Sequence, residues 1–247
     1  MTTASSMSTW ICPPTRQETI ENLVSGVDRY NPSNVGILED YLYHQIRSSE
    51  YDCLANLAIL KLYQFNPDLY NADVVINILL KALAASPLPD YNLCMSLLDE
   101  RPAPSPEDDE DADPSAVILP ILTSLHGLLL ECKFPVFWKR YRGEEVKGLR
   151  DNYTVEFKGF EEAIREVVVR AVKATFTRIG RERFGGYLDL QGSELDSFIS
   201  NLGWKMDGGV VTVPANPDNQ IESTVVHEAI KLPQLAKVIA HSAKIAA

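Results

Sequence analysis

The chain has 247 residues, a formal net charge of −11 and a pI of about 4.9. This acidity opposes nonspecific binding to nucleic acid or to an anionic membrane, although a local basic patch could override it. Hydrophobic residues make up 45% of the sequence, and no apolar run is long enough to cross a bilayer. Because the N-terminus also lacks the features of a secretory signal, we predict a cytoplasmic protein.

Cysteine and histidine positions predict no metal site and no bound cofactor. The cysteines are far apart and form no C-x-x-C pair, so we expect free thiols. The histidines form no H-E-x-x-H motif, and neither a glycine-rich phosphate loop nor a G-x-S-x-G elbow is present. We therefore predict that the protein is not an enzyme. These residues are Cys12, Cys53, Cys94 and Cys132, and His44, His126, His227 and His241.

The N-terminal part predicts a tail followed by two helices. Residues 1–14 are rich in serine and threonine and are predicted to be disordered. A first helix is expected from about Arg16 to Val27. A second begins after an Asn-Pro pair, in which Asn31 would cap the helix and Pro32 would take the first helical position.

The stretch from Tyr51 to Pro67 predicts the central helix of the fold. Asp52 is placed as its N-cap, and Pro67 ends it. Apolar side chains cover nearly its whole circumference, so other helices must enclose it. We infer an architectural role for this helix and no function of its own. The residues expected to meet water are Asn56, Lys61 and Gln64.

A repeated aromatic-Asn-Pro signal indicates stacked helical hairpins. Phe65-Asn66-Pro67 repeats Tyr30-Asn31-Pro32, and two more helices are expected at about 72–84 and 90–98. Recurrence at roughly 34–47 residues is typical of tetratricopeptide and HEAT-like arrays. We predict a helical repeat domain over residues 15–155.

An acidic, proline-rich segment at 101–115 interrupts this pattern. Its sequence is RPAPSPEDDEDADPS, in which alanines are the only apolar residues apart from the prolines. Such a composition cannot be buried in a core, so we predict a solvated loop inserted between two helices. Two roles stay open: a spacer, or a phosphorylation site at Ser105, which is followed by Pro106 and a run of carboxylates.

Helical patterning resumes at about 115–132, and a short aromatic helix is expected at 134–142. Phe137 and Trp138 in that helix are expected to pack in the core. The surrounding region 133–150 is locally basic. We favour a solvated rim that faces an acidic protein, and contact with RNA stays open as the alternative. The basic residues are Lys133, Lys139, Arg140, Arg142, Lys147 and Arg150.

The clearest amphipathic pattern runs over residues 156–180. Its apolar residues form one stripe, which predicts a single long helix. On the opposite side, Glu161 and Arg165 are four residues apart, as are Glu166 and Arg170, in the favourable order for helix ion pairs. We predict that this helix connects two domains.

Residues 181–247 predict a winged-helix domain followed by a C-terminal helix. A short helix comes first, and Ser193 is placed to cap the next one. Asp207-Gly208 is a strong hairpin signal between two short strand patterns. The stretch from Ile221 to Ile230 stays ambiguous between strand and helix.

Several motifs together resemble one known family. The resemblance is to the k subunit of eukaryotic translation initiation factor 3, and it covers about residues 16–245. The long motifs carry it, since they are more specific than a short site motif. They are DRYNP at 28–32, YDCLANLAILKLYQFNP at 51–67, ILLKAL at 78–83, LLLECKFPVFW at 128–138, GFEEAIR at 159–165 and GW at 203–204.

This resemblance implies a mainly α fold, with an N-terminal HEAT-like helical repeat domain and a C-terminal winged helix with a small β-hairpin, related to PCI domains. It implies a non-catalytic scaffold subunit of the complex that helps assemble the 40S preinitiation complex. The implied partners are other subunits of the factor, chiefly the l subunit, and the 40S ribosomal subunit through the complex. The alternative is a winged-helix protein that binds RNA. The N-terminal tail and the acidic segment depart from the family pattern, so no contact is carried over to them.

The predicted winged helix suits a protein partner better than DNA. A winged helix that reads DNA inserts the helix before its hairpin into a groove, and that helix must be neutral or basic because phosphates repel acidic side chains. Here that helix carries Glu194 and Asp196. We therefore predict that the hairpin docks a protein, by strand pairing or apolar contact. We also expect that Val211→Asp, Val213→Asp or a charge reversal at Lys205 would each weaken the complex without unfolding the chain. The candidate docking residues are Lys205, Val211 and Val213.

Overall fold

The structure is a computed structural model that describes residues 13–48, 50–99 and 114–220, and near the C-terminus 234–237, 239 and 241. Several predictions fall outside these residues. They concern the tail before Pro13, most of the acidic segment with Ser105, the stretch from Ile221 to Ile230, and most of the final helix.

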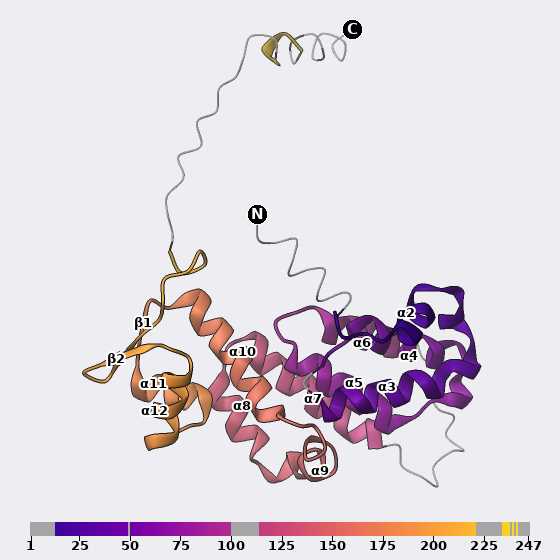
Figure 1. The fold of residues 1–247 in the computed structure, drawn as a ribbon, viewed down its shortest axis with the longest axis horizontal. Helices are drawn as coiled ribbons and strands as arrows, with labels where there is room; N and C mark the ends of the chain where they lie inside the picture. The colour runs from indigo at the N-terminus through magenta and orange to yellow at the C-terminus, as the bar shows by residue number, and fades with distance from the viewer. Residues whose placement is uncertain are drawn as a thin grey trace.

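The fold is mainly α, as predicted, with a helical domain at one end and a winged helix at the other (Figure 1). The helical domain runs through α8 and the short helices that follow it. Its α-helices are α2 (Glu18–Ser25), α3 (Val35–Arg47), α4 (Cys53–Phe65), α5 (Ala72–Ala84), α6 (Asp90–Asp99), α7 (Pro114–Leu130), α8 (Phe134–Tyr141) and α9 (Lys147–Leu149). The shorter helical turns are η1 (Val27–Tyr30), η2 (Pro32–Asn34), η3 (Pro67–Leu69), η4 (Glu144–Val146) and η5 (Arg150–Thr154).

Local capping signals place the first helices where the sequence predicts them. The Asp52 carboxylate accepts a hydrogen bond from the backbone N–H of Ala55, which confirms it as the N-cap of α4. The Asn31 side chain accepts one from the N–H of Ser33, and Pro32 begins η2. This turn is a separate 3₁₀ segment, so α3 itself begins only at Val35.

The two aromatic-Asn-Pro signals are brought together in space. Each Asn-Pro pair starts a 3₁₀ turn, η2 in one case and η3 in the other. The aromatic residues before them meet, with the ring centres of Tyr30 and Phe65 6.3 Å apart. The repeated signal therefore marks two neighbouring turns of the helical stack.

Helix α5 is the most completely enclosed helix of the domain. All ten residues from Val74 to Leu83 are buried, and α5 packs against α3, α6, α7 and α10. Helix α4 packs against α3 and α6, but Phe65 at its end stays exposed. The centre of the stack is thus α5, while α4 was predicted to hold that place.

Asn56 corrects the predicted solvent face of α4. Its side chain is 1% exposed, whereas it was expected to meet water. Its amide oxygen accepts a hydrogen bond from Gln45 Nε2 at 2.9 Å, and Gln45 Oε1 accepts the backbone N–H of Asp52. A buried amide is stable where its polar atoms are paired, and α3 supplies that partner.

The predicted single helix over 156–180 is wrong at both ends. Helix α10 spans Phe160–Thr175, and strand β1 spans Arg178–Gly180. Gly159 has a φ of 76°, a left-handed conformation that favours glycine and breaks the helical path before α10. Residues after Phe176 are extended because β1 pairs with a strand far along the chain.

The winged helix has the chain order α10, β1, α11, α12, β2, β3, so α10 is its first helix. Helix α10 also packs against α5 and therefore contacts both parts of the molecule. The antiparallel sheet has the order β1-β3-β2. Helix α12 begins at Gly192 without a side-chain cap, so the predicted capping by Ser193 is wrong. The remaining elements are α11 (Arg181–Leu188), α12 (Gly192–Asn201), β2 (Lys205–Asp207) and β3 (Val210–Thr212).

The predicted hairpin is confirmed, but its turn lies one residue later than the Asp207-Gly208 signal placed it. Strands β2 and β3 are joined through Gly208 and Gly209, whose φ angles are 53° and 81°. Two consecutive positive φ angles suit the tight two-residue turn that follows the right-handed twist of a hairpin. Asp207 belongs to β2 and pairs with Val210, so the register is set by a Gly-Gly turn, in which Met206 pairs with Val211.

Candidate docking surface

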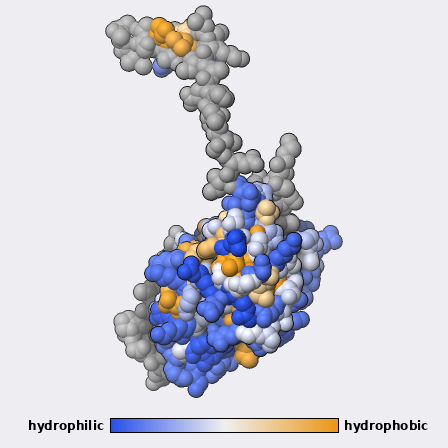
Figure 2. All heavy atoms as spheres, turned by 90° about the vertical axis from the view of Figure 1, so that its left-hand side faces the viewer, coloured by the Kyte–Doolittle hydropathy of each residue, from blue (hydrophilic) through white to orange (hydrophobic). Residues whose placement is uncertain are grey.

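Strand β2 forms one edge of the sheet. All three of its residues are exposed, and Met206 keeps 45% of its surface accessible. Its inner side pairs with β3, and no described strand pairs with its outer side. Edge strands present backbone N–H and C=O groups that can pair with another chain. Figure 2 shows this end of the molecule, where small apolar groups lie within a mostly hydrophilic face.

Of the three predicted docking residues, only Lys205 is exposed. Val211 is 0% exposed and Val213 is 4% exposed, and both belong to the hydrophobic core. Their side chains support the sheet from inside and offer no surface to a partner. The expectation that an aspartate there would leave the chain folded is therefore wrong, because the new carboxylate would be buried without a partner. A docking role for Lys205 stays a prediction.

The helix before the hairpin, α12, has an acidic surface. Arg181 Nε donates a hydrogen bond to Asp196 Oδ1 at 2.8 Å, and this bond holds the pKa of Asp196 below its usual value. Glu194 is exposed on the first turn of the same helix. Because Arg181 compensates the Asp196 charge, Glu194, which has no ion pair among the described residues, is the carboxylate of this helix that opposes DNA reading.

Much of the predicted basic rim at 133–150 is neutralised within the molecule. Arg142 donates to both carboxylate oxygens of Glu161, at 2.7 and 2.9 Å, and lies 3.2 Å from Asp189. It thereby joins α8 to the first helix of the winged helix. Paired charges attract phosphate less, and they attract an acidic protein less for the same reason, so the exposed Lys139 and Lys147 are the part of the predicted rim without an ion pair in the described chain. The other pairs are Lys133–Glu131, Arg140–Glu145 and Arg150–Asp151.

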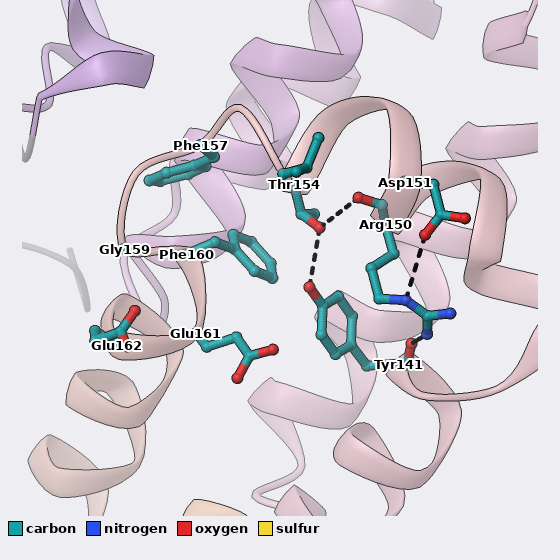
Figure 3. Close-up of a pocket in the computed structure, with 10 residues that line it drawn as sticks. Tyr141, Arg150, Asp151, Thr154, Phe157, Gly159, Phe160, Glu161 and Glu162 are labelled. Atoms are coloured by element: carbon teal, nitrogen blue, oxygen red, sulfur yellow. Dashed lines mark hydrogen bonds and ion pairs between the residues drawn. The ribbon is translucent and has the colours of Figure 1, made fainter.

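A cavity of about 550 Å³ lies beside this rim, at the start of α10 (Figure 3). The Tyr141 hydroxyl and Thr154 Oγ1 are 2.9 Å apart, and Thr154 Oγ1 also donates to the carbonyl of Arg150. Arg150 in turn donates to the carbonyl of Tyr141. Burial raises the pKa of Tyr141, so its hydroxyl stays protonated. These groups satisfy one another and form a rigid wall, without an activated nucleophile.

The described thiols are free, and the two buried ones are not activated. Burial raises the pKa of Cys53 to about 12 and also raises that of Cys94, so neither is a thiolate at neutral pH. Cys132 is also free, while Cys12 lies outside the described residues. Within the described ranges, no group of histidine, cysteine and acidic side chains could hold a metal ion, and no helix could span a membrane.

Known proteins resemble this chain over nearly its whole length. The family model described as CSN8/PSMD8/EIF3K matches residues 69–225. A Mycosarcoma maydis protein called eukaryotic translation initiation factor 3 subunit K is 44% identical, over 96% of this chain and 95% of its own length. The chain belongs to the eukaryotic translation initiation factor 3 subunit K family. Proteins of the same name from Cryptococcus neoformans and Phaeosphaeria nodorum are 40% and 36% identical.

Membership of the subunit K family confirms the resemblance found in the sequence motifs. It makes the chain a relative of translation initiation factor subunits, which belong to a multisubunit complex. The family match begins in η3 and extends beyond β3, so it includes both α5 and the winged helix. The alignments with the named subunits extend this similarity over most of the helical domain.

Two features of this subunit K relative were missed by sequence reasoning. Met206 is exposed, whereas Trp204, two residues before it, is buried against Phe184, with ring centres 5.4 Å apart. Trp138 was placed in the core, yet its indole N–H donates to the carbonyl of Tyr187 at 2.8 Å and so joins α8 to α11. A buried indole N–H needs a hydrogen-bond acceptor, so placing Trp138 in the core already implied that some acceptor lies beside it.

Proposed function

We propose that this chain is a non-catalytic scaffold subunit of translation initiation factor 3, and that it binds the l subunit through strand β2. The exposed edge of β2 is the observation that chiefly supports the proposal. The relatives are named as subunits of translation initiation factor 3, which points to that complex, and the free edge of β2 is a surface suited to strand addition. We also propose that the chain works in the cytoplasm and reaches the 40S ribosomal subunit through the complex.

The backbone and two side chains of β2 offer different contributions to such an interface. The backbone would supply hydrogen bonds, and the Met206 side chain would supply a flexible apolar contact. Lys205 would meet a carboxylate of the partner and set the register of pairing. Because β2 is only three residues long, the neighbouring surface of the winged helix must add buried area to reach a stable interface.

Capture of the purified l subunit by the full chain tests this proposal. We expect Lys205→Glu and Met206→Asp each to raise the Kd at least tenfold, because one reverses the rim charge and the other places a carboxylate in the apolar contact. The matched control is Lys147→Glu, an exposed lysine on α9, which should bind as the wild type does. Unchanged binding by both β2 variants, with folding verified by circular dichroism, would exclude this docking site.

A separate measurement addresses the RNA alternative. We expect the chain alone to show no micromolar affinity for labelled RNA at about 150 mM salt, since weak electrostatic contacts fade there. Lys139 and Lys147 are exposed and have no described ion pair, so they are the residues to change. If the wild type bound RNA at this salt and Lys139→Glu with Lys147→Glu abolished it, region 133–150 would be an RNA site.

A further inference from the structure

Lys81 on α5 is a buried cation without a carboxylate partner. Its side chain is 3% exposed, and its ammonium donates to the carbonyl of Gln45 at 2.8 Å. It also lies 4.5 Å from the centre of the Phe157 ring. No described residue forms an ion pair with it, although an ammonium has three donors. Desolvation lowers its pKa to about 8, against a smaller opposing effect of the Glu50 carboxylate, which lies beyond ion-pair distance, so at pH 7 it is still mainly charged.

This ammonium lies at the base of a groove of about 430 Å³, and its small exposure shows that it lies deep. The groove runs between α5, the turn that follows it, and one side of α10. Its walls are mainly small or apolar. Wall residues include Ala84, Ala85, Leu88, Phe157 and Ala163.

The charges around the groove favour an acidic visitor. Arg170 Nη2 donates to the carbonyl of Ser86 at 3.0 Å and so does not form the ion pair with Glu166 that the sequence predicts. Glu162 lies 3.5 Å from Arg165, so its charge is partly compensated. The groove is lined by three cations, Lys81, Lys158 and Arg170, against two carboxylates, Glu162 and Glu166. The lining is therefore net positive within a chain whose overall charge is −11.

We propose that this groove binds a glutamate side chain of a peptide segment from a protein partner, with an adjacent apolar side chain packed against Leu88 and the alanines. The carboxylate would pair with Lys81 and complete its hydrogen bonds. A glutamate fits because its aliphatic stem can pass between apolar walls while the peptide backbone stays near the rim. A terminal carboxylate would instead carry backbone polar groups into those walls, where they would lack partners.

Matched short peptides test the proposal on the full, ¹⁵N-labelled chain at pH 7. The first probe is N-acetyl-Glu-Leu-amide, and its control is N-acetyl-Gln-Leu-amide, which differs only in charge. We expect the first to shift the backbone amide signals of Ala84, Ala85 and Ala163 with a millimolar Kd, and the second to bind at least tenfold more weakly. N-acetyl-leucine has a terminal carboxylate in place of a glutamate side chain, so it tests whether the groove binds the end of a chain instead.

Two variants locate the binding. Lys81→Met removes the cation and should abolish the preference for the glutamate probe. Because that change affects a buried position, Ala163→Leu provides a second route, since it fills the groove from a half-buried position on α10. Equal binding of the Glu and Gln probes would overturn the proposal. So would tighter binding of N-acetyl-leucine, or unchanged affinity in a folded Ala163→Leu variant.

Discussion

Asp52 shows how one side chain can hold three parts of the helical domain together. Its carboxylate caps α4, and it accepts hydrogen bonds from Arg16 at 2.6 and 2.7 Å. The Tyr41 hydroxyl donates a further bond from α3. Arg16 and Asp52 are both almost fully buried, so neither charge can be hydrated in place of its partner. Such a pair is costly to break from one side.

We expect Asp52→Ala to lower the free energy of unfolding by about 3–5 kcal/mol, because it leaves the Arg16 guanidinium buried without its main partner. Urea denaturation followed by circular dichroism measures the change. The control is Glu21→Gln, which alters the half-exposed partner of Arg16 and should cost less than about 1 kcal/mol. Equal losses in the two variants would contradict the assignment of Asp52 as the buried anchor.

Lys81 gives a pH dependence with a defined sign. Its folded-state pKa of about 8 lies below the ordinary value of 10.5, so between these values the unfolded chain binds more protons. The contribution of Lys81 to the free energy of unfolding therefore rises with pH in that window, while the opposite contribution of the buried thiols cancels between wild type and a Lys81 variant. From pH 7.5 to 9.5, we expect wild type to gain about 2 kcal/mol relative to Lys81→Met. A difference between the two proteins that stays constant with pH would contradict the burial of this ammonium.

Among the elements, strand β3 is the central strand on which the sheet of the winged helix depends. It pairs with β1 on one side and β2 on the other. Val211 faces the core, while Thr212 points to solvent between Arg178 and Lys205 of the neighbouring strands. One strand thus offers a buried and an exposed position side by side, as the alternation of side chains in a strand requires.

We expect Val211→Asp to destabilise the winged helix by at least about 3 kcal/mol, because the carboxylate would be buried without a partner. Thr212→Asp on the opposite face should change stability by less than about 1 kcal/mol, since Arg178 and Lys205 flank it. Thermal unfolding followed by near-ultraviolet circular dichroism separates the two. Similar melting of both variants would show that β3 does not have the described orientation.

At the scale of the whole molecule, the helical domain and the winged helix are joined by several kinds of contact. Helix α8 packs against α11, and α5 packs against α10. Trp138 donates its indole N–H to the carbonyl of Tyr187, and Arg142 pairs with Glu161 and Asp189. The buried hydrogen bond contributes more to this junction than the exposed ion pairs do, because solvent screens the latter.

We expect Trp138→Phe to cost about 1–3 kcal/mol, because the carbonyl of Tyr187 loses its donor and a small cavity remains. Amide hydrogen exchange should become faster in α11, where the acceptor lies. Arg142→Gln should cost less than about 1 kcal/mol, with a difference from wild type that shrinks at high salt. Unchanged exchange in α11 of Trp138→Phe would mean that this contact does not couple the two parts.

The sequence by itself determined what depends on neighbouring residues and on long motifs. Helix α5 begins and ends where its apolar run predicts, the Asp52 cap is a local signal, the Asp-Gly pair located the hairpin to within one residue, and the motifs identified the family. The tertiary structure decided whatever needed a partner distant in the chain. Strand β1 exists because β3 pairs with it, and Asn56 is buried because Gln45 satisfies its amide. Val211 lies in the core because the sheet turns one face inward, which no local pattern can specify when the strands are three residues long.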